Sequence, residues 1–166
     1  MNHCYLSAVS VGRKDKILYT HIIITLMVNN LEEDKGTGKN QIVGNIGLYY
    51  ACYELSRRGW NAMPTARNAR GVDIVIYNQK GTESHTVQVK SLSKRNPAPF
   101  GSTLHTLIAE YIFVVNNVVE TPNIFIVDTP TARSRIREEN KDGKKSYWFQ
   151  PKDYEEFKDN WDIIKN

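Results

Sequence analysis

Two hydrophobic patterns alternate along the chain, and together they predict a mixed α/β protein. Residues 111–115 and 124–127 are unbroken apolar runs, which are typical of strands buried on both faces. Residues 41–58 have the composition of a helix and end at Gly59, a natural helix C-cap. The middle of this segment is apolar nearly all round, so we expect the helix to be covered on more than one side.

The segment 71–94 predicts the hairpin around which the rest of the chain is organised. Residues 72–77 are β-branched and apolar except for Asp73, and residues 84–92 alternate between apolar and polar. The connector at 78–81 has turn chemistry. We therefore expect two short strands joined by a tight turn.

Three polar residues are expected to converge on one face of this hairpin. Side chains alternate along a strand, so Gln88 and Lys90 point the same way. A turn centred on residues 79–80 places Asp73 opposite residue 86, within two positions of Gln88. A carboxylate with an amide oxygen suits Mg²⁺, and a neighbouring lysine can orient or deprotonate a water. The alternative is a solvated hairpin; the β-branched setting of Asp73 favours the metal, because a buried carboxylate needs partners.

Shorter elements complete the expected domain. The pattern predicts two further strands and three further helices, namely strands over 60–63 and 146–149 and helices over 103–109, 131–140 and 151–164. The last helix carries an apolar stripe that we interpret as core: Tyr154, Phe157, Trp161 and Ile164.

The first 40 residues predict an N-terminal extension of uncertain structure, followed by one domain over 41–166. A chain of 166 residues suffices for one domain with a real core. An apolar run within the extension is too short to span a bilayer, so we expect an edge strand there and no membrane partner. Translation from Met27 is the alternative for this region. Residues 31–40 predict a polar loop.

Positive charge is concentrated around the predicted hairpin. The chain carries a net charge of +4, whereas residues 57–95 hold eight basic and two acidic residues, a net charge of +6. Such clustering indicates an anionic partner, with nucleic acid as the first candidate and a solvated basic face as the alternative. The two cysteines, Cys4 and Cys52, form neither a disulfide framework nor a zinc site, which favours a reducing, cytoplasmic location.

The order of these elements, with Asp73 and Gln88-Val89-Lys90 on the central hairpin, resembles the PD-(D/E)XK nuclease superfamily. The Q-x-K form of the motif is similar to that of Mrr-type restriction enzymes and some homing endonucleases. Residues 47–90 also resemble archaeal Holliday-junction resolvases, in which the first helix ends Leu-x-x-x-Gly-aromatic, here residues 55–60. The resemblance covers residues 44–127. It implies a restriction-endonuclease-like mixed β-sheet with an αβββαβ core flanked by helices, here with an extra C-terminal strand and helix.

The resemblance implies an endonuclease that hydrolyses phosphodiester bonds in DNA with Mg²⁺ or Mn²⁺. Asp73 would bind the metal, Gln88 would complete the metal site, and Lys90 would assist the attacking water. Many members of the superfamily dimerise to cut both strands of DNA, so the resemblance also allows a homodimer.

The chain departs from the superfamily in its first helix, which often carries a glutamate about three turns before its end. Here that neighbourhood offers Asn45 and Leu48, and Glu54 comes later in the helix. Glu54 either substitutes for the missing ligand or pairs with a neighbouring arginine. Because few carboxylates remain, a degenerate relative that binds nucleic acid or a protein partner without cleavage is the alternative function.

Residues beside the predicted site are candidates for nucleic-acid contacts. The loop before the Asp73 strand and the end of the Lys90 strand supply the candidates Arg67, Asn68, Arg70, Ser91, Lys94 and Arg95. The alternative is a loop with solvated arginines. A third possibility is a structural subunit whose hairpin is solvated and whose basic segment has no anionic ligand. Salt-sensitive DNA binding would separate the other two functions from this one, because phosphate contacts weaken as salt rises.

Overall fold

The computed structural model describes residues 37–66 and 69–165. The chain divides into two compact units, Met1–Lys39 and Asn40–Asn166, and the second holds all of the elements that concern the site. The edge strand expected in the extension lies outside the described residues, as do Arg67 and Asn68.

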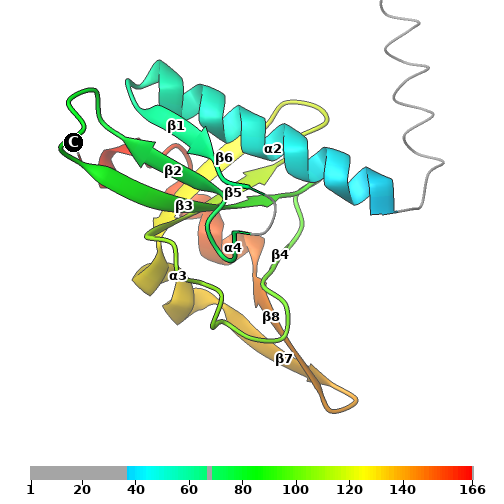
Figure 1. The fold of residues 1–166 in the computed structure, drawn as a ribbon. Helices are drawn as coiled ribbons and strands as arrows, with labels where there is room; N and C mark the ends of the chain where they lie inside the picture. The colour runs from blue at the N-terminus through cyan, green and yellow to red at the C-terminus, as the bar shows by residue number, and fades with distance from the viewer. Residues whose placement is uncertain (1–36, 67–68, 166) are drawn as a thin grey trace, which may run out of the picture. The chain divides into compact units, whose positions relative to one another are not determined.

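A five-stranded mixed sheet forms the centre of the second unit, which confirms the predicted α/β class (Figure 1). Its order is β1-β2-β3-β5-β6, with β3 and β5 parallel and the other neighbours antiparallel. The strands are β1 (Asn61–Pro64), β2 (Ile74–Tyr77), β3 (Ser84–Ser91), β5 (Tyr111–Asn116) and β6 (Asn123–Asp128).

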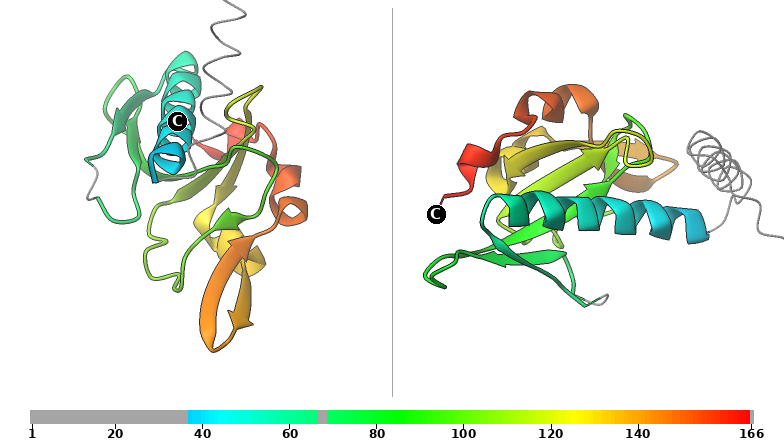
Figure 2. Two further views of the ribbon diagram at one scale, coloured as in Figure 1. Left: turned by 90° about the vertical axis from the view of Figure 1, so that its right-hand side faces the viewer. Right: turned by 90° about the horizontal axis from the view of Figure 1, so that it is seen from above.

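Helix α2 (Thr37–Arg57) lies across one face of this sheet (Figure 2). Its C-terminus matches the prediction, because Gly59 takes a positive φ of 87°. Its N-terminus does not, since residues 37–40 are helical where the polar pattern predicts a loop. Residues 37–40 contain no proline, and their one glycine costs a helix only about 1 kcal/mol. The apolar helix predicted from residue 41 can therefore extend backward through these four residues. Within the described ranges no helix is long and apolar enough to cross a membrane.

The strands β5 and β6 are buried because both faces of the sheet are covered. Phe113 and Val115 belong to an apolar cluster shared with α2, whereas Ile112 and Val114 belong to a second cluster on the opposite face. This two-sided burial explains the unbroken apolar runs that predict these strands. The second cluster is covered by α3 (Thr129–Arg135), α4 (Pro151–Tyr154) and a three-stranded sheet of β4 (Ala98–Pro99), β8 (Lys144–Phe149) and β7 (Arg137–Lys141).

Two predicted helices are wrong in part or in full. Residues 103–109 form turns, not a helix, and Arg133 holds them by donating to the carbonyls of Leu104 (3.2 Å) and Leu107 (2.5 Å). The helix predicted over 131–140 ends at Arg135, and the residues after it pair with β8 as β7. The connection between the parallel strands β3 and β5 therefore lacks the helix of an αβββαβ core.

The predicted C-terminal helix is broken into three short pieces, α4, η1 (Glu155–Phe157) and η2 (Trp161–Ile163). Its apolar stripe is core, as predicted, but Tyr154 packs in the second cluster and Ile164 in the first. One straight helix cannot pack its apolar residues against both faces of a sheet. The chain turns at Asp159, where φ is 51°, after a bridge between Lys158 and Phe125 of β6.

A glycine in α2 allows the helix to approach β3 closely. A Cβ at Gly47 would lie 2.1 Å from Ser91 Oγ and 2.6 Å from Ser91 Cβ, whereas a Cβ at Gly44 meets nothing within 4 Å. Gly47→Ala is therefore expected to lower the free energy of unfolding by about 1–3 kcal/mol. Gly44→Ala, the control in the same helix, is expected to raise it by about 0.5–1 kcal/mol through helix propensity alone. Urea denaturation measures both, and equal effects would contradict the close contact.

Candidate functional site

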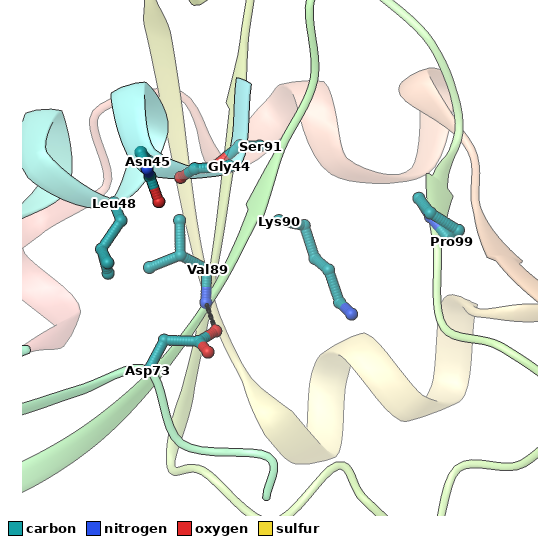
Figure 3. Close-up of a pocket in the computed structure, with 8 residues that line it drawn as sticks. All are labelled: Gly44, Asn45, Leu48, Asp73, Val89, Lys90, Ser91 and Pro99. Carbon is teal, nitrogen blue, oxygen red and sulfur yellow. Dashed lines mark hydrogen bonds between the residues drawn. The ribbon is translucent and has the colours of Figure 1, made fainter. Parts of the chain in front are cut away.

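A cleft of about 280 Å³ opens between α2, β3 and Asp73, the residue directly before β2 (Figure 3). Two of the three residues predicted for catalysis, Asp73 and Lys90, line this cleft. The full lining set is Gly44, Asn45, Leu48, Asp73, Val89, Lys90, Ser91 and Pro99.

The carboxylate of Asp73 is held against β3. Its Oδ2 accepts a hydrogen bond of 2.7 Å from the Val89 N–H, and its backbone N–H donates to the Val87 carbonyl at 2.8 Å. These two contacts lie on either side of Gln88. Oδ2 of Asp73 is therefore hydrogen-bonded to β3, whereas Oδ1 forms no hydrogen bond with a described residue.

The strand register differs from the prediction by two residues. Ile74 pairs with Val87, so Asp73 comes beside Gln88 and not opposite residue 86. The connector is the reason, because it is wider than a tight turn: the Asn78 N–H donates to the Glu83 carbonyl, and Asn78 Oδ1 accepts from the Thr82 N–H. The observed register brings Asp73 closer to the two β3 residues than the sequence predicts.

The loop that delivers Asp73 is fixed at both ends. Thr65 donates its backbone N–H to the Asp73 carbonyl (2.9 Å) and its hydroxyl to the Val72 carbonyl (2.7 Å). At Gly71, φ is +76°, and a Cβ would lie 2.0 Å from the Thr106 carbonyl oxygen. Only glycine fits there without moving the backbone. These contacts of Thr65 and Gly71 give the Asp73 carboxylate a defined position at the cleft.

Lys90 extends from β3 into the space between Asp73 and Pro99 (Figure 3). Its ammonium lies 4.7 Å from the centroid of the Phe100 ring. Burial lowers the pKa of Lys90, and the nearby Asp73 charge opposes that shift without cancelling it. Within the described part of the chain, no carboxylate forms an ion pair with it. A partly buried lysine with a lowered pKa gives up its proton more easily than a solvated one.

Gln88 lies on the same β3 face as Lys90 but does not line the cleft. Its side chain is only 9% exposed, and its Oε1 has no hydrogen-bond partner in the described structure. An unpartnered buried amide oxygen costs about 1–3 kcal/mol. A cation or an ordered water beside Asp73 would offset that cost.

Glu54 is not brought to the cleft. It lies near the C-terminus of α2, where its carboxylate pairs with Arg57 at 3.0 Å and with Arg58 at 2.5 Å. Of the two roles that the sequence leaves open for Glu54, the structure shows the arginine partner. The site therefore contains no acid from α2, and the residues that the helix contributes to the cleft are Gly44, Asn45 and Leu48.

The role of Glu54 predicts a pH-dependent loss of stability. Burial alone would raise the pKa of Glu54, but the hydrogen bonds from Arg58 and Arg57 outweigh it and lower that pKa. A carboxyl with a lowered folded-state pKa stabilises the fold above its unfolded pKa and stops doing so as the pH falls through the folded value. We expect Glu54→Gln to lower the free energy of unfolding at pH 7 by about 1–2 kcal/mol. Denaturation at pH 7 and near pH 3 checks this, because the difference should shrink in acid.

The predicted nucleic-acid contacts that the structure describes divide into exposed side chains and side chains with partners. Arg70 and Lys94 are exposed. Ser91 donates its hydroxyl to the Gly44 carbonyl (3.2 Å) and so ties β3 to α2. Arg95 forms a two-point ion pair with Glu155, 2.8 Å between Nη2 and Oε2, and borders a different cleft. Arg95 is therefore not placed at the mouth of the site.

The sequence did not indicate Asn45 as a site residue. Asn45 borders the cleft with Asp73 and also a second cleft of about 500 Å³ between α2 and the loop after β1. It occupies the part of the helix where the superfamily often carries glutamate, and its amide oxygen is the only signal that the sequence offers.

The side-chain oxygen donors that line the cleft are one carboxylate (Asp73), one amide (Asn45) and one hydroxyl (Ser91). Among the described residues, no group of three or more His, Cys, Asp or Glu side chains is positioned to hold a metal ion. Comparison of the chain with protein-family models and with curated proteins finds no match to either.

Proposed function

We propose that the protein is a metal-dependent endonuclease that hydrolyses phosphodiester bonds in DNA, on a variant of the restriction-endonuclease-like fold. The observation that carries the proposal is the unpartnered, buried Oε1 of Gln88, a residue that the strand register brings next to Asp73 and that lies on the strand carrying Lys90. These three groups together do not stabilise a purely structural hairpin, because an unpaired amide oxygen and a partly buried ammonium each destabilise it.

The donor set fits Mg²⁺ or Mn²⁺. Asp73 supplies a carboxylate and Asn45 an amide oxygen at the cleft, and Gln88 adds a buried, unpartnered amide oxygen from the β3 position next to Asp73. Hard divalent cations prefer oxygen ligands and retain several waters, so two or three protein ligands suffice. When bound, the metal polarises the phosphate and lowers the pKa of a coordinated water. The single carboxylate implies weak affinity, and we expect millimolar metal to be needed.

Lys90 is the residue that moves the proton. Its lowered pKa allows it to accept a proton from the attacking water as the water oxygen bonds to phosphorus and the bond to the leaving oxygen breaks. Its charge then stabilises the product phosphate. Exposed Arg70 and Lys94 contribute to holding the DNA backbone.

The catalytically degenerate alternative has one observation in its favour. Asp73 is the only carboxylate among the described residues that line the cleft. A protein of this kind would bind DNA in a salt-sensitive manner without cutting it.

Cleavage of supercoiled plasmid and of branched DNA tests the proposal. With Mg²⁺ or Mn²⁺ we expect nicked or linear products, and with EDTA we expect none. DNA binding without cleavage at any metal concentration would favour the degenerate alternative. Neither binding nor cleavage would overturn both.

Gln88→Leu tests the metal site without relying on activity. Removing the unpartnered oxygen is expected to raise the free energy of unfolding of the metal-free protein by about 1 kcal/mol. The same change is expected to abolish the rise in melting temperature that Mn²⁺ gives the wild type. Differential scanning calorimetry with and without Mn²⁺ measures both. An unchanged Mn²⁺ shift would remove Gln88 from the site. Gln79→Leu in the exposed connector is the control for the Mn²⁺ shift alone, because it also removes the hydrogen bond of 2.9 Å that Gln79 donates to the Gly59 carbonyl.

A further inference from the structure

We propose that the exposed face of α2 binds unpaired bases of single-stranded DNA next to the cleft. The surface consists of five residues spaced four apart, and we call it the tyrosine stripe: Gln41, Asn45, Tyr49, Tyr53 and Arg57. The role of the stripe in cleavage rests on the proposed nuclease function, whereas its binding of DNA does not.

The two tyrosines are the most unusual part of this face. Tyr49 is 63% exposed and Tyr53 is 58% exposed, although both are large aromatic residues on a helix whose opposite face is core. Residues four apart are neighbours on a helix surface, so the two rings lie one after the other along α2. Aromatic rings exposed in this way are the platforms on which single-stranded nucleic acids stack their bases.

The spacing of the rings favours single strands over duplex. Four residues of helix span about 6 Å, whereas stacked bases in a duplex repeat every 3.4 Å. Two rings about 6 Å apart fit bases that have separated from one another. Bases inside a duplex are paired and stacked, and a tyrosine on a helix surface cannot reach their faces.

The stripe is continuous with the candidate site. The second cleft is bordered by Gln41, Asn45 and Tyr49 of the stripe, and it shares Asn45, Leu48 and Asp73 with the first cleft. A strand whose phosphate lies at Asp73 therefore has its next bases beside Tyr49. The amides of Gln41 and Asn45 can hydrogen-bond to base edges there.

Charge on this face also matches DNA. Arg57 lies 5.5 Å from the centre of the Tyr53 ring, and Arg57 and Arg58 share the single carboxylate of Glu54. One positive charge is thus left over at the end of the stripe, where it can meet a phosphate. Phenol rings, amides and a cation together suit a nucleic acid better than an apolar protein surface.

Fluorescence anisotropy with the full chain tests the stripe. The probes are a labelled oligothymidylate of about 16 nucleotides and a duplex of the same length, both in EDTA so that no cleavage occurs. We expect the oligothymidylate to bind more tightly than the duplex. Tyr49→Ala and Tyr53→Ala are each expected to weaken oligothymidylate binding about tenfold, since base stacking on one ring contributes on that scale. Tyr49→Phe keeps the ring and should bind as the wild type does.

Val119→Ala is the control, because Val119 is 46% exposed on the loop between β5 and β6 and does not belong to the tyrosine stripe. Equal binding of single strands and duplex, or no effect of either alanine variant, would overturn the proposal even if the protein cuts DNA. A change of mass in light scattering for the alanine variants, with DNA binding intact, would assign the stripe to a second copy of the chain and also overturn it. Tyrosine-dependent binding without metal-dependent cleavage would retain the stripe and reject the nuclease.

Discussion

Asp73→Asn is expected to reduce metal-dependent DNA cleavage by about a thousandfold or more. Asparagine keeps the shape of the side chain and can still accept the hydrogen bond from the Val89 N–H. It removes the only carboxylate among the described residues that line the cleft, and with it the charge that holds a divalent cation. The measurement is single-turnover cleavage of plasmid over a range of Mn²⁺ concentrations.

Glu83→Gln is the matched control for this variant. Glu83 is exposed in the connector of the same hairpin, so its loss changes the net charge equally without touching the cleft. Cleavage that survives Asp73→Asn, or that falls equally in Glu83→Gln, would place the active site elsewhere.

Lys90→Met is expected to have the second largest effect, a loss of cleavage of about 10²–10⁴-fold, the usual contribution of a general base. Methionine fills the space of the lysine stem but accepts no proton. The same change is expected to raise the free energy of unfolding at neutral pH, because a buried ammonium beside an aromatic ring becomes an apolar side chain. A variant that is more stable yet inactive separates a functional lysine from a structural one.

The stability gain of Lys90→Met should depend on pH in a defined direction. Burial lowers the folded-state pKa of Lys90, so the wild type is penalised in full below that pKa. The penalty fades as the pH rises through the folded-state pKa toward the ordinary pKa of lysine. The difference in unfolding free energy between the two proteins should therefore shrink in alkaline solution. Lys94→Met, at an exposed position just beyond β3, should show neither effect.

The sequence pattern was sufficient to predict the elements that are buried most completely. β5 and β6 follow from unbroken apolar runs, and the end of α2 follows from Gly59, whose backbone takes a positive φ. These signals are local, because burial on both faces and a left-handed φ each require particular residue types. The same is true of the shared strand face of Gln88 and Lys90, which alternation alone determines.

Elements that depend on distant contacts were not predictable from the pattern. Residues 103–109 look helical, but Arg133 fixes them as turns by binding two of their carbonyls. The C-terminal stripe looks like one helix, yet its apolar residues pack on opposite faces of the sheet. Short helices take most of their stability from packing, so tertiary contacts decide whether they form.

Some features of the site also follow from the sequence pattern, whereas others depend on tertiary contacts. Sequence alone predicted that Asp73 belongs to the strand beside the Gln88–Lys90 strand, whereas in the structure Asp73 is the residue directly before β2. Only the tertiary structure decided the register, which depends on how Asn78 closes the connector. It also decided that Glu54 pairs with arginines, that Asn45 borders the cleft, and that the Gln88 oxygen is buried without a partner. Pairing and burial are properties of what surrounds a residue, and a sequence pattern specifies only the residue itself.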